Sequence, residues 1–405
     1  MGKRMGIGNI HCHHINGDCV PDNLTKQQTG KPEWFLRCFL ANVVGRIFVG
    51  RHIEDFLRIM RSRDIGTVTQ YHVEQKDDAG IDYSIVLSLD FSCIDPEYHG
   101  YNIDFEIQLE ETAKACARHP FRFFPFFGFE ARRPGVIDLL KNAHEKYGIV
   151  GIKMYPAFGY DPRPEKNDFI PPVESDVEDI SQVLKNLYEF ADEKNLPILT
   201  HCSPGGSYQC TIREEEKYKK IWGYTEPSNF LKIGFKYGLR ICFAHMGGNV
   251  YKKGMRELAI QWFNQICNLI SYAHEQGSKC RFYTDRANAL AYIFKKRRKR
   301  EDHFQQTADL FSESSYSPYI LFGSDWPLGM HLFNENEYLK KYKSNLNQDA
   351  FSHYTQKNIS QFLFGEELKI PDNYIEYLKR YNNGDLPELP DWIEEKDGFL
   401  KLVSD

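Results

Sequence analysis

The chain has 405 residues, of which 41% are hydrophobic and 26% are charged, a composition typical of a globular protein with a sizeable core. Its net charge of −5 argues against general nucleic-acid binding. No stretch of about 18 apolar residues is present, so we expect no membrane span.

Eight short apolar runs follow one another along the chain, and each ends at polar or reactive residues. Each has about four to eight β-branched, aromatic or aliphatic residues, as strands that are buried on both faces do. The runs occupy residues 7–14, 82–91, 121–130, 148–156, 196–204, 239–248, 280–288 and 319–327.

Segments with apolar residues at helical spacing separate several of these runs. Segment 132–148 closes on a glycine, which is a helix stop signal. Segment 176–195 begins with acidic residues that suit the positive end of a helix dipole. Segments 226–238 and 254–277 also show the helical pattern. Eight strands that alternate with helices predict a (β/α)8 barrel, with a doubly wound sheet as the alternative.

The chain is longer than such a barrel requires. A (β/α)8 barrel needs about 250 residues, so roughly 150 are extra. We interpret 1–405 as a single barrel domain with three additions. They are a helical insertion at about 20–75, over the carboxyl-end mouth, a loop insertion at about 203–230, and a C-terminal extension at about 366–405, interpreted as one helix and a docked tail.

Reactive side chains stand at the ends of several predicted strands, which converge on one mouth in a barrel. His11 and His13 are two residues apart, so both imidazoles can face the mouth while Cys12 and His14 point away. The other strand-end residues are Lys153, His201, His245 and Asp325. Three or four imidazoles and one carboxylate around a point predict a first-row metal site, most readily zinc.

Four motifs in this order, IHCHH, THC, AHMGG and FGSDWP, resemble the amidohydrolase superfamily, in particular its amidohydrolase 2 group. The resemblance runs from His11 to 358–365. It implies a (β/α)8 barrel and an activity among metal-dependent hydrolases, lactonases and decarboxylases of aromatic or unsaturated acids. Asn9 departs from the pattern, because relatives often have Asp two residues before the HxH pair.

The resemblance also implies a role for each strand-end residue. His11, His13, His201 and Asp325 resemble the ligands of one divalent ion, zinc or alternatively manganese. Asp325 further resembles the residue that moves the proton of metal-bound water. His245 resembles either a ligand of a second metal or the histidine that polarises the substrate.

Three residues have two interpretations each. In binuclear members of the superfamily a lysine on strand four is carboxylated and bridges two metals, whereas an unmodified Lys153, which we favour, would bind a substrate carboxylate. Arg286 is a candidate for binding an anionic substrate or for pairing with Asp285. Tyr155 is a candidate for lining the mouth or for packing.

The leading functional prediction is a metal-dependent hydrolase that uses a metal-bound hydroxide to open a small, carboxylate-bearing ester, lactone or amide. The first alternative is a metal-dependent, non-oxidative decarboxylase of an aromatic or unsaturated acid. The second is a non-catalytic barrel that keeps the metal site. The expected partner is a small-molecule substrate, and a homodimer is possible.

The cysteines and the N-terminal residues indicate the cellular compartment. The ten cysteines include no CxxC pair, and the first residues lack the apolar run of a signal peptide. We therefore expect reduced thiols, no zinc-finger site and a cytoplasmic protein. The basic run at 295–300 is interpreted as a solvated helix face.

Overall fold

The computed structural model describes residues 2–19, 53–62, 64–93, 104–170, 177–204, 215–248, 256–287, 297–313, 315–329 and 334–404. Most of the predicted insertion at 20–75, part of the loop at 203–230 and the side chains of the basic run at 295–300 lie outside the described residues.

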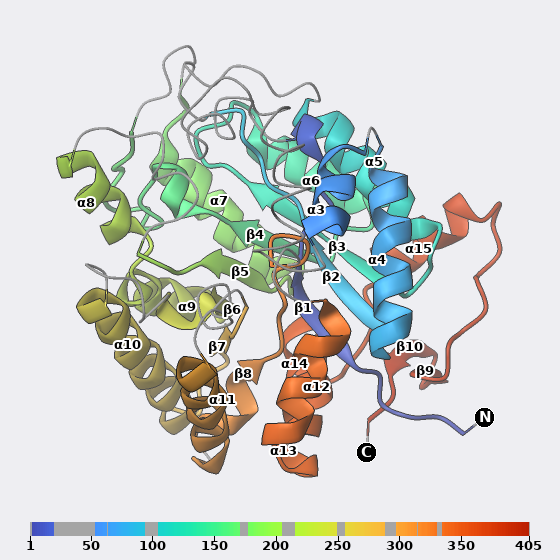
Figure 1. The fold of residues 1–405 in the computed structure, drawn as a ribbon. Helices are drawn as coiled ribbons and strands as arrows, with labels where there is room; N and C mark the ends of the chain where they lie inside the picture. The colour runs from blue at the N-terminus through green and yellow to red at the C-terminus, as the bar shows by residue number, and fades with distance from the viewer. Residues whose placement is uncertain are drawn as a thin grey trace.

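Eight parallel strands form a nearly closed barrel in the order β1 to β8, with helices between them around the outside (Figure 1). The predicted (β/α)8 fold is confirmed, and each strand is shorter than its predicted run. The strands are β1 Gly8–Cys12, β2 Tyr83–Leu87, β3 Phe123–Phe129, β4 Gly151–Met154, β5 Ile198–His201, β6 Arg240–Ala244, β7 Arg281–Asp285 and β8 Ile320–Leu321.

The seam between the last strand and the first closes the barrel. β8 has only two residues, and the segment that follows it continues alongside β1. The amide of Ile10 donates to the carbonyl of Phe322 (3.0 Å), and the amide of Asp325 donates to the carbonyl of His11 (2.8 Å). On its other side β1 pairs with β2, where the register shifts between Asn9 and Cys12. Such irregularities re-aim side chains and are common beside active sites.

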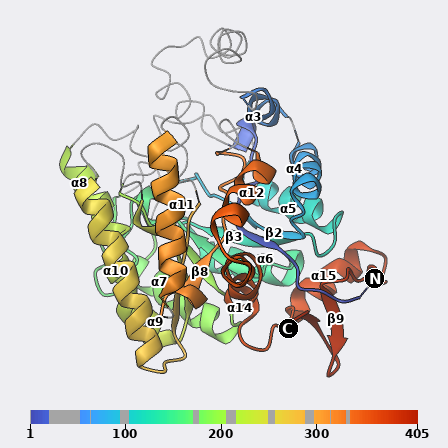
Figure 2. The same ribbon diagram turned by 60° about the horizontal axis from the view of Figure 1, so that its bottom comes forward.

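The helices cover the outer faces of the strands (Figures 1 and 2). The segments predicted as helical at 132–148, 176–195 and 254–277 form α6, α7 and α10, and 226–238 forms a short 3-10 turn, Pro227–Phe230, followed by α9. The α-helices are α3 Ile53–Met60, α4 Ile65–Ala79, α5 Phe105–Ala117, α6 Val136–Tyr147, α7 Ile180–Glu193, α8 Glu215–Tyr224, α9 Leu231–Tyr237, α10 Arg256–Glu275, α11 Arg297–Ser312, α12 Glu335–Asn345, α13 Gln348–Ser352, α14 Asn358–Phe364 and α15 Asp372–Tyr381.

Aromatic residues fill much of the core. All seven residues of β3, FFPFFGF, are buried. Its single glycine, Gly128, is required by a close approach of the backbone that follows β2, because a Cβ there would lie 2.5 Å from the carbonyl oxygen of Ser88. No helix in the described part of the chain is long and apolar enough to cross a bilayer. The eight cysteines that the structure describes are all buried and free of disulfides.

The C-terminal extension differs from its prediction as a helix with a docked tail. It contains α15 and an antiparallel hairpin of β9, Ile393–Lys396, and β10, Phe399–Leu402. Asp397 and Gly398 form the two-residue turn, both at positive φ (55° and 78°). Asp-Gly between two short runs is a strong hairpin signal, and the sequence analysis missed it.

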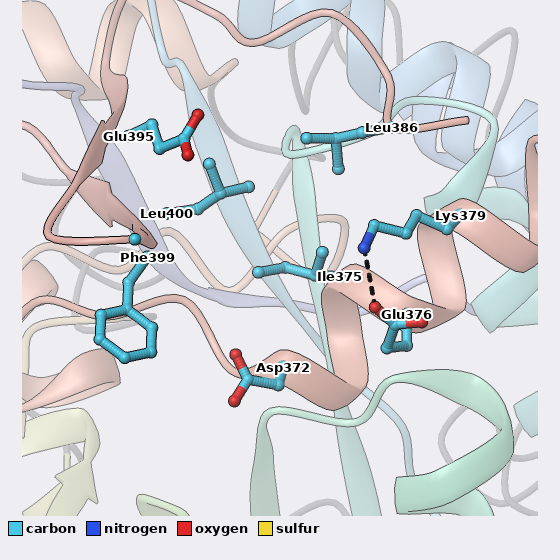
Figure 3. A pocket seen from close by; sticks show the side chains of 9 residues that line it. Asp372, Ile375, Glu376, Lys379, Leu386, Glu395, Phe399 and Leu400 are labelled. Carbon is cyan, nitrogen blue, oxygen red and sulfur yellow. Dashed lines mark hydrogen bonds and ion pairs between the residues drawn. The ribbon is translucent and has the colours of Figure 1, made fainter. Parts of the chain in front are cut away.

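The extension packs at the amino-terminal end of the barrel, where the amide of Arg4 donates to the carbonyl of Asp391 (3.1 Å). A cavity of about 250 Å³ lies between α15 and the hairpin (Figure 3). Its lining includes Ile375, Lys379 and Leu400 but none of the strand-end residues predicted to form the site. This cavity is therefore separate from the predicted site.

Candidate functional site

His11 and His13 lie where β1 reaches the mouth, and both are almost fully buried. The Nδ1 atom of His13 lies 2.9 Å from the carbonyl oxygen of Leu87. The Nδ1 atom of His11 lies 2.8 Å from Oδ2 of Asp285. Because both partners accept hydrogen bonds, each ring carries its proton on Nδ1 and leaves the Nε2 lone pair free. Each Nε2 atom lies 3.5 Å from the same oxygen, Oδ1 of Asp325.

Asp325 follows β8 and has a left-handed backbone with φ of 57°, an uncommon conformation for a residue other than glycine. Burial raises the pKa of this carboxyl, but its interactions with the imidazoles of His13, His11 and His245 outweigh burial and lower it overall. Asp325 is therefore an ionised carboxylate at neutral pH, aimed at two imidazole nitrogens.

His245 begins the short 3-10 turn His245–Gly247 that follows β6, at a φ of 65°. Its Nδ1 atom lies 3.1 Å from the carbonyl oxygen of Ala287, so this ring is also held through Nδ1. The ring centroid lies 4.9 Å from that of His11 and 4.9 Å from that of His201. Backbone strain of this kind concentrates at functional sites.

His201 ends β5, and the structure gives neither of its buried ring nitrogens a hydrogen-bond partner among the described residues. Burial, more than the neighbouring cations, lowers the pKa of its imidazole well below the usual value. A neutral imidazole with two unused nitrogens is costly to bury unless something binds it.

Lys153 lies in β4 with a fully buried side chain, and its Nζ atom has no hydrogen-bond partner in the described part of the chain. Burial lowers its pKa to about 8, while Asp285 and Asp325 act in the opposite direction. The Nζ atom lies 5.7 Å from the ring centroid of Tyr155. An amine held this way is available to an anionic ligand.

The ring of Tyr155 stacks on His201, with centroids 4.2 Å apart, and on Phe158, with centroids 4.3 Å apart. Packing against two rings supports the packing interpretation of Tyr155. Arg286 follows β7, is buried, and has its Nη1 atom 3.2 Å from Sδ of Met246.

Two groups of metal-capable atoms result. The ligand atoms of His11, His13 and Asp325 lie within 4.8 Å of one another, as do those of His11, His245 and Asp285. The described residues do not place His201 in either trio, and it joins the cluster through its ring contact with His245. The predicted strand-end residues thus converge on one end of the barrel.

Comparison with known proteins identifies the family of the chain. A family model described as amidohydrolase matches residues 103–330, more than half of the chain. The chain belongs to the amidohydrolase family. It is therefore an enzyme of that family. The matched region includes His201, His245 and Asp325 and begins after His11 and His13.

Solved structures similar to this amidohydrolase include 2,6-dihydroxybenzoate decarboxylase from Rhizobium, with 15% identity, 89% of this chain and 99% of that chain covered, and a TM-score of 0.48. For 5-carboxyvanillate decarboxylase from Novosphingobium aromaticivorans the identity is 11%, the coverage is 89% of this chain and 96% of that chain, and the TM-score is 0.49. For an amidohydrolase from Burkholderia multivorans the identity is 10%, the coverage is 94% of this chain and 100% of that chain, and the TM-score is 0.49. Similarity at this level says nothing about the reaction of this amidohydrolase. No curated protein matches the chain.

The position of Asp285 in this amidohydrolase was not predicted from the sequence. Its Oδ2 atom contacts His11, and its Oδ1 atom accepts hydrogen bonds from the amides of His245 (2.8 Å) and Ala287 (3.0 Å). One fully buried carboxylate thus orients two of the histidines. Its position as the last residue of β7 was the available signal, because strand-end residues face the mouth.

Proposed function

We propose that this amidohydrolase is a metal-dependent hydrolase of a small, carboxylate-bearing ester, lactone or amide. In this proposal His11, His13, His201 and Asp325 bind one divalent ion, zinc in the first instance and manganese as the alternative. The observation that carries the proposal is the approach of two buried Nε2 atoms to one oxygen of Asp325, at 3.5 Å each.

The donor set fits a metal ion. Two ligands about 2.1 Å from a tetrahedral ion lie about 3.4 Å apart, which is close to the separation of each Nε2 atom from Oδ1 of Asp325. Imidazole nitrogens with one carboxylate suit zinc and other first-row ions. The unused nitrogens of buried His201 supply a further ligand.

A divalent ion bound there would acidify water and polarise a substrate oxygen. Asp325, as an ionised buried carboxylate, accepts a proton and returns it to the leaving group. His245 is held through Nδ1 by the carbonyl of Ala287, which leaves Nε2 either to polarise the substrate oxygen or to bind a second metal.

Lys153, Tyr155 and Arg286 are the proposed substrate-binding residues. The buried Nζ atom of Lys153 has no hydrogen-bond partner among the described residues, which supports its pairing with a substrate carboxylate. Tyr155 stacks on His201 and Phe158 and is the candidate for contact with the substrate beside Lys153. Arg286 is the second candidate for an anion.

One observation favours decarboxylation as a second candidate. Lys153 lies beside a buried apolar cluster that is separate from the main core. Its buried members are Leu89, Phe91, Tyr155, Ala157, Phe158, Ile221 and Tyr224. An aromatic acid bound beside Lys153 would place its ring against this apolar surface. Such a surface disfavours a charged carboxylate that is not paired.

A substrate screen tests the proposal. Metal-loaded enzyme is assayed with lactones, esters, amides and aromatic carboxylic acids, with release of acid and of CO2 measured separately, and chelated enzyme serves as the control. The proposal expects metal-dependent ester, lactone or amide opening. Metal-dependent CO2 release would select the decarboxylase, and no metal-dependent turnover would favour a non-catalytic metal-binding barrel.

Asp285→Asn is expected to weaken zinc binding by about 10- to 100-fold, because partners that orient metal-ligating histidines usually contribute this much. The amide oxygen can still accept from the amides of His245 and Ala287, but the NH2 group in place of Oδ2 cannot accept the Nδ1–H of His11. Competition with a chromophoric chelator measures the affinity. Asp161→Asn, at a buried carboxylate paired with Arg163, is the control, and an equal effect in both variants would contradict the assignment.

A further inference from the structure

A second buried polar cluster lies beside the β1–β8 seam. The Nδ2 atom of Asn9 donates to Oγ of Ser324 (2.7 Å) and to Oε1 of Glu335 (2.5 Å). The hydroxyl of Ser324 donates to the same Oε1 (2.9 Å). Asn9 and Glu335 are separated by 326 residues in sequence, and all three side chains are at most 1% exposed. One carboxylate oxygen thus joins the first strand to the segment after the last one.

This cluster is linked directly to the proposed metal ligands. The Oδ1 atom of Asn9 accepts from the backbone amides of His11 and Ser324, both at 3.2 Å. Ser324 immediately precedes Asp325. Because β8 has only two residues, few ladder bonds hold this seam. The Asn9–Ser324–Glu335 triangle therefore adds to the bonds that fix Asp325 relative to His11.

The other oxygen of Glu335 extends the cluster to α4. Its Oε2 atom lies 3.2 Å from Nε2 of His72, whose Nδ1 atom lies 2.9 Å from Nε2 of His14. His14, predicted to point away from the mouth, does contact this helix. The ring of His72 also stacks on Trp326, with centroids 4.1 Å apart. Glu335 is thus connected to both sides of the HxH motif.

The protons along the series from His14 through His72 to Glu335 can be assigned consistently. Burial is the main cause that lowers the pKa of His14 and of His72, so both rings are neutral at neutral pH. His14 then donates from Nε2 to Nδ1 of His72, and Nε2 of His72 faces Oε2 of Glu335 at 3.2 Å. Glu335 opens α12, where the positive end of the helix dipole favours a carboxylate. Oε1 of the carboxylate accepts two hydrogen bonds, from Asn9 and Ser324, and Oε2 lies 3.2 Å from Nε2 of His72.

We propose that Glu335 is a positioning residue for the metal site, which clamps the segment that bears His11 and His13 against the segment that bears Asp325. The proposal rests on the metal site of the proposed function. Glu335 lies outside the mouth and contacts neither metal nor substrate. It acts through Asn9 and Ser324, which hold the backbone amides beside the ligands.

Two substitutions at Glu335 separate the clamp from the charge. Glu335→Met has a similar volume but no acceptor, so the Asn9 amide and the Ser324 hydroxyl lose their shared partner. Glu335→Gln keeps one oxygen for both donors. Its amide N–H can donate to Nε2 of His72 if His72 and His14 both move their proton to Nδ1. In that arrangement His72 donates to His14, and His14 donates to Oγ1 of Thr69, which lies 2.9 Å from its Nδ1 atom.

The experiment measures the affinity of the metal-free, full-length chain for Zn2+ by competition with a chromophoric chelator, and records the absorption spectrum of the Co2+ form. Glu335→Met is expected to bind Zn2+ about 10- to 100-fold more weakly, with an altered Co2+ spectrum. Glu335→Gln is expected to stay near the parent in both. Glu337→Met, at an exposed position on the same helical turn, is the control and is expected to change neither.

Each outcome has a defined reading. A merely structural Glu335 would lower the melting temperature of the Met variant without changing the Zn2+ affinity of the folded protein, which overturns the clamp alone. If the Met variant does not fold, Ser324→Ala replaces it. This variant is expected to bind Zn2+ several-fold more weakly, and unchanged Zn2+ affinity would overturn the clamp. A parent chain that binds neither ion overturns the proposed function and the clamp together.

One further outcome concerns a trio of potential ligands. The ligand atoms of Cys12, His72 and Glu335 also lie within 4.8 Å of one another. If the parent binds two equivalents of Zn2+ and Glu335→Met loses one of them, this trio is itself a metal site, and the clamp is overturned.

Discussion

Asp325→Asn is expected to lower turnover by about 100-fold or more while metal content and fold stay largely intact. The amide has nearly the same shape, and its oxygen can still face the two imidazole nitrogens that lie 3.5 Å from Oδ1. It cannot accept a proton, so only the proton-transfer role is removed. Steady-state kinetics on a substrate from the screen, together with elemental analysis, make the comparison.

A matched control separates this role from the general cost of losing a buried carboxylate. Asp82→Asn changes a buried aspartate just before β2, at the opposite end of the barrel, where it pairs with Arg4. This variant is expected to lose stability and to keep its turnover. Near-full turnover of Asp325→Asn would remove Asp325 from the mechanism.

His245→Ala is expected to lower turnover by about 100-fold, which is typical for the loss of one group that stabilises a developing charge. Metal content is expected to stay at one ion per chain. This result would identify His245 as the group that polarises the substrate, which we favour because an unmodified Lys153 cannot bridge two ions. His274→Ala, in α10 and bonded to Tyr319, is the control and should retain full activity.

The alternative role of His245 gives a different pattern. If His245 binds a second metal, the parent chain contains two ions and the variant contains one. A carboxylated Lys153 would then be visible by mass spectrometry of the intact native protein. That pattern would contradict the single-metal account and would favour the binuclear one.

The barrel could be predicted because its information is local. Each strand is a short apolar run, and the strand ends carry the reactive residues, so His11, His201 and His245 could be assigned to one mouth without any contact information. Strand lengths were less predictable. The run 319–327 looks continuous, yet the strand stops at Leu321 and the chain adopts a left-handed turn at Asp325.

The supporting residues could not be predicted in the same way. His11 and Asp285 are 274 residues apart, and Asn9 and Glu335 are 326 residues apart. No periodicity or spacing encodes such a pair, because the partners meet only when the barrel closes. The C-terminal hairpin is a different case, since Asp397 and Gly398 carried a local signal that was overlooked.

The most direct test of the metal site is elemental analysis of the untagged chain, purified without chelator. The account predicts about one zinc or manganese ion per chain, and loss of that ion in His11→Ala and His13→Ala variants that remain folded. Less than about 0.2 equivalents in the parent, with no gain when zinc or manganese is added, would contradict the account.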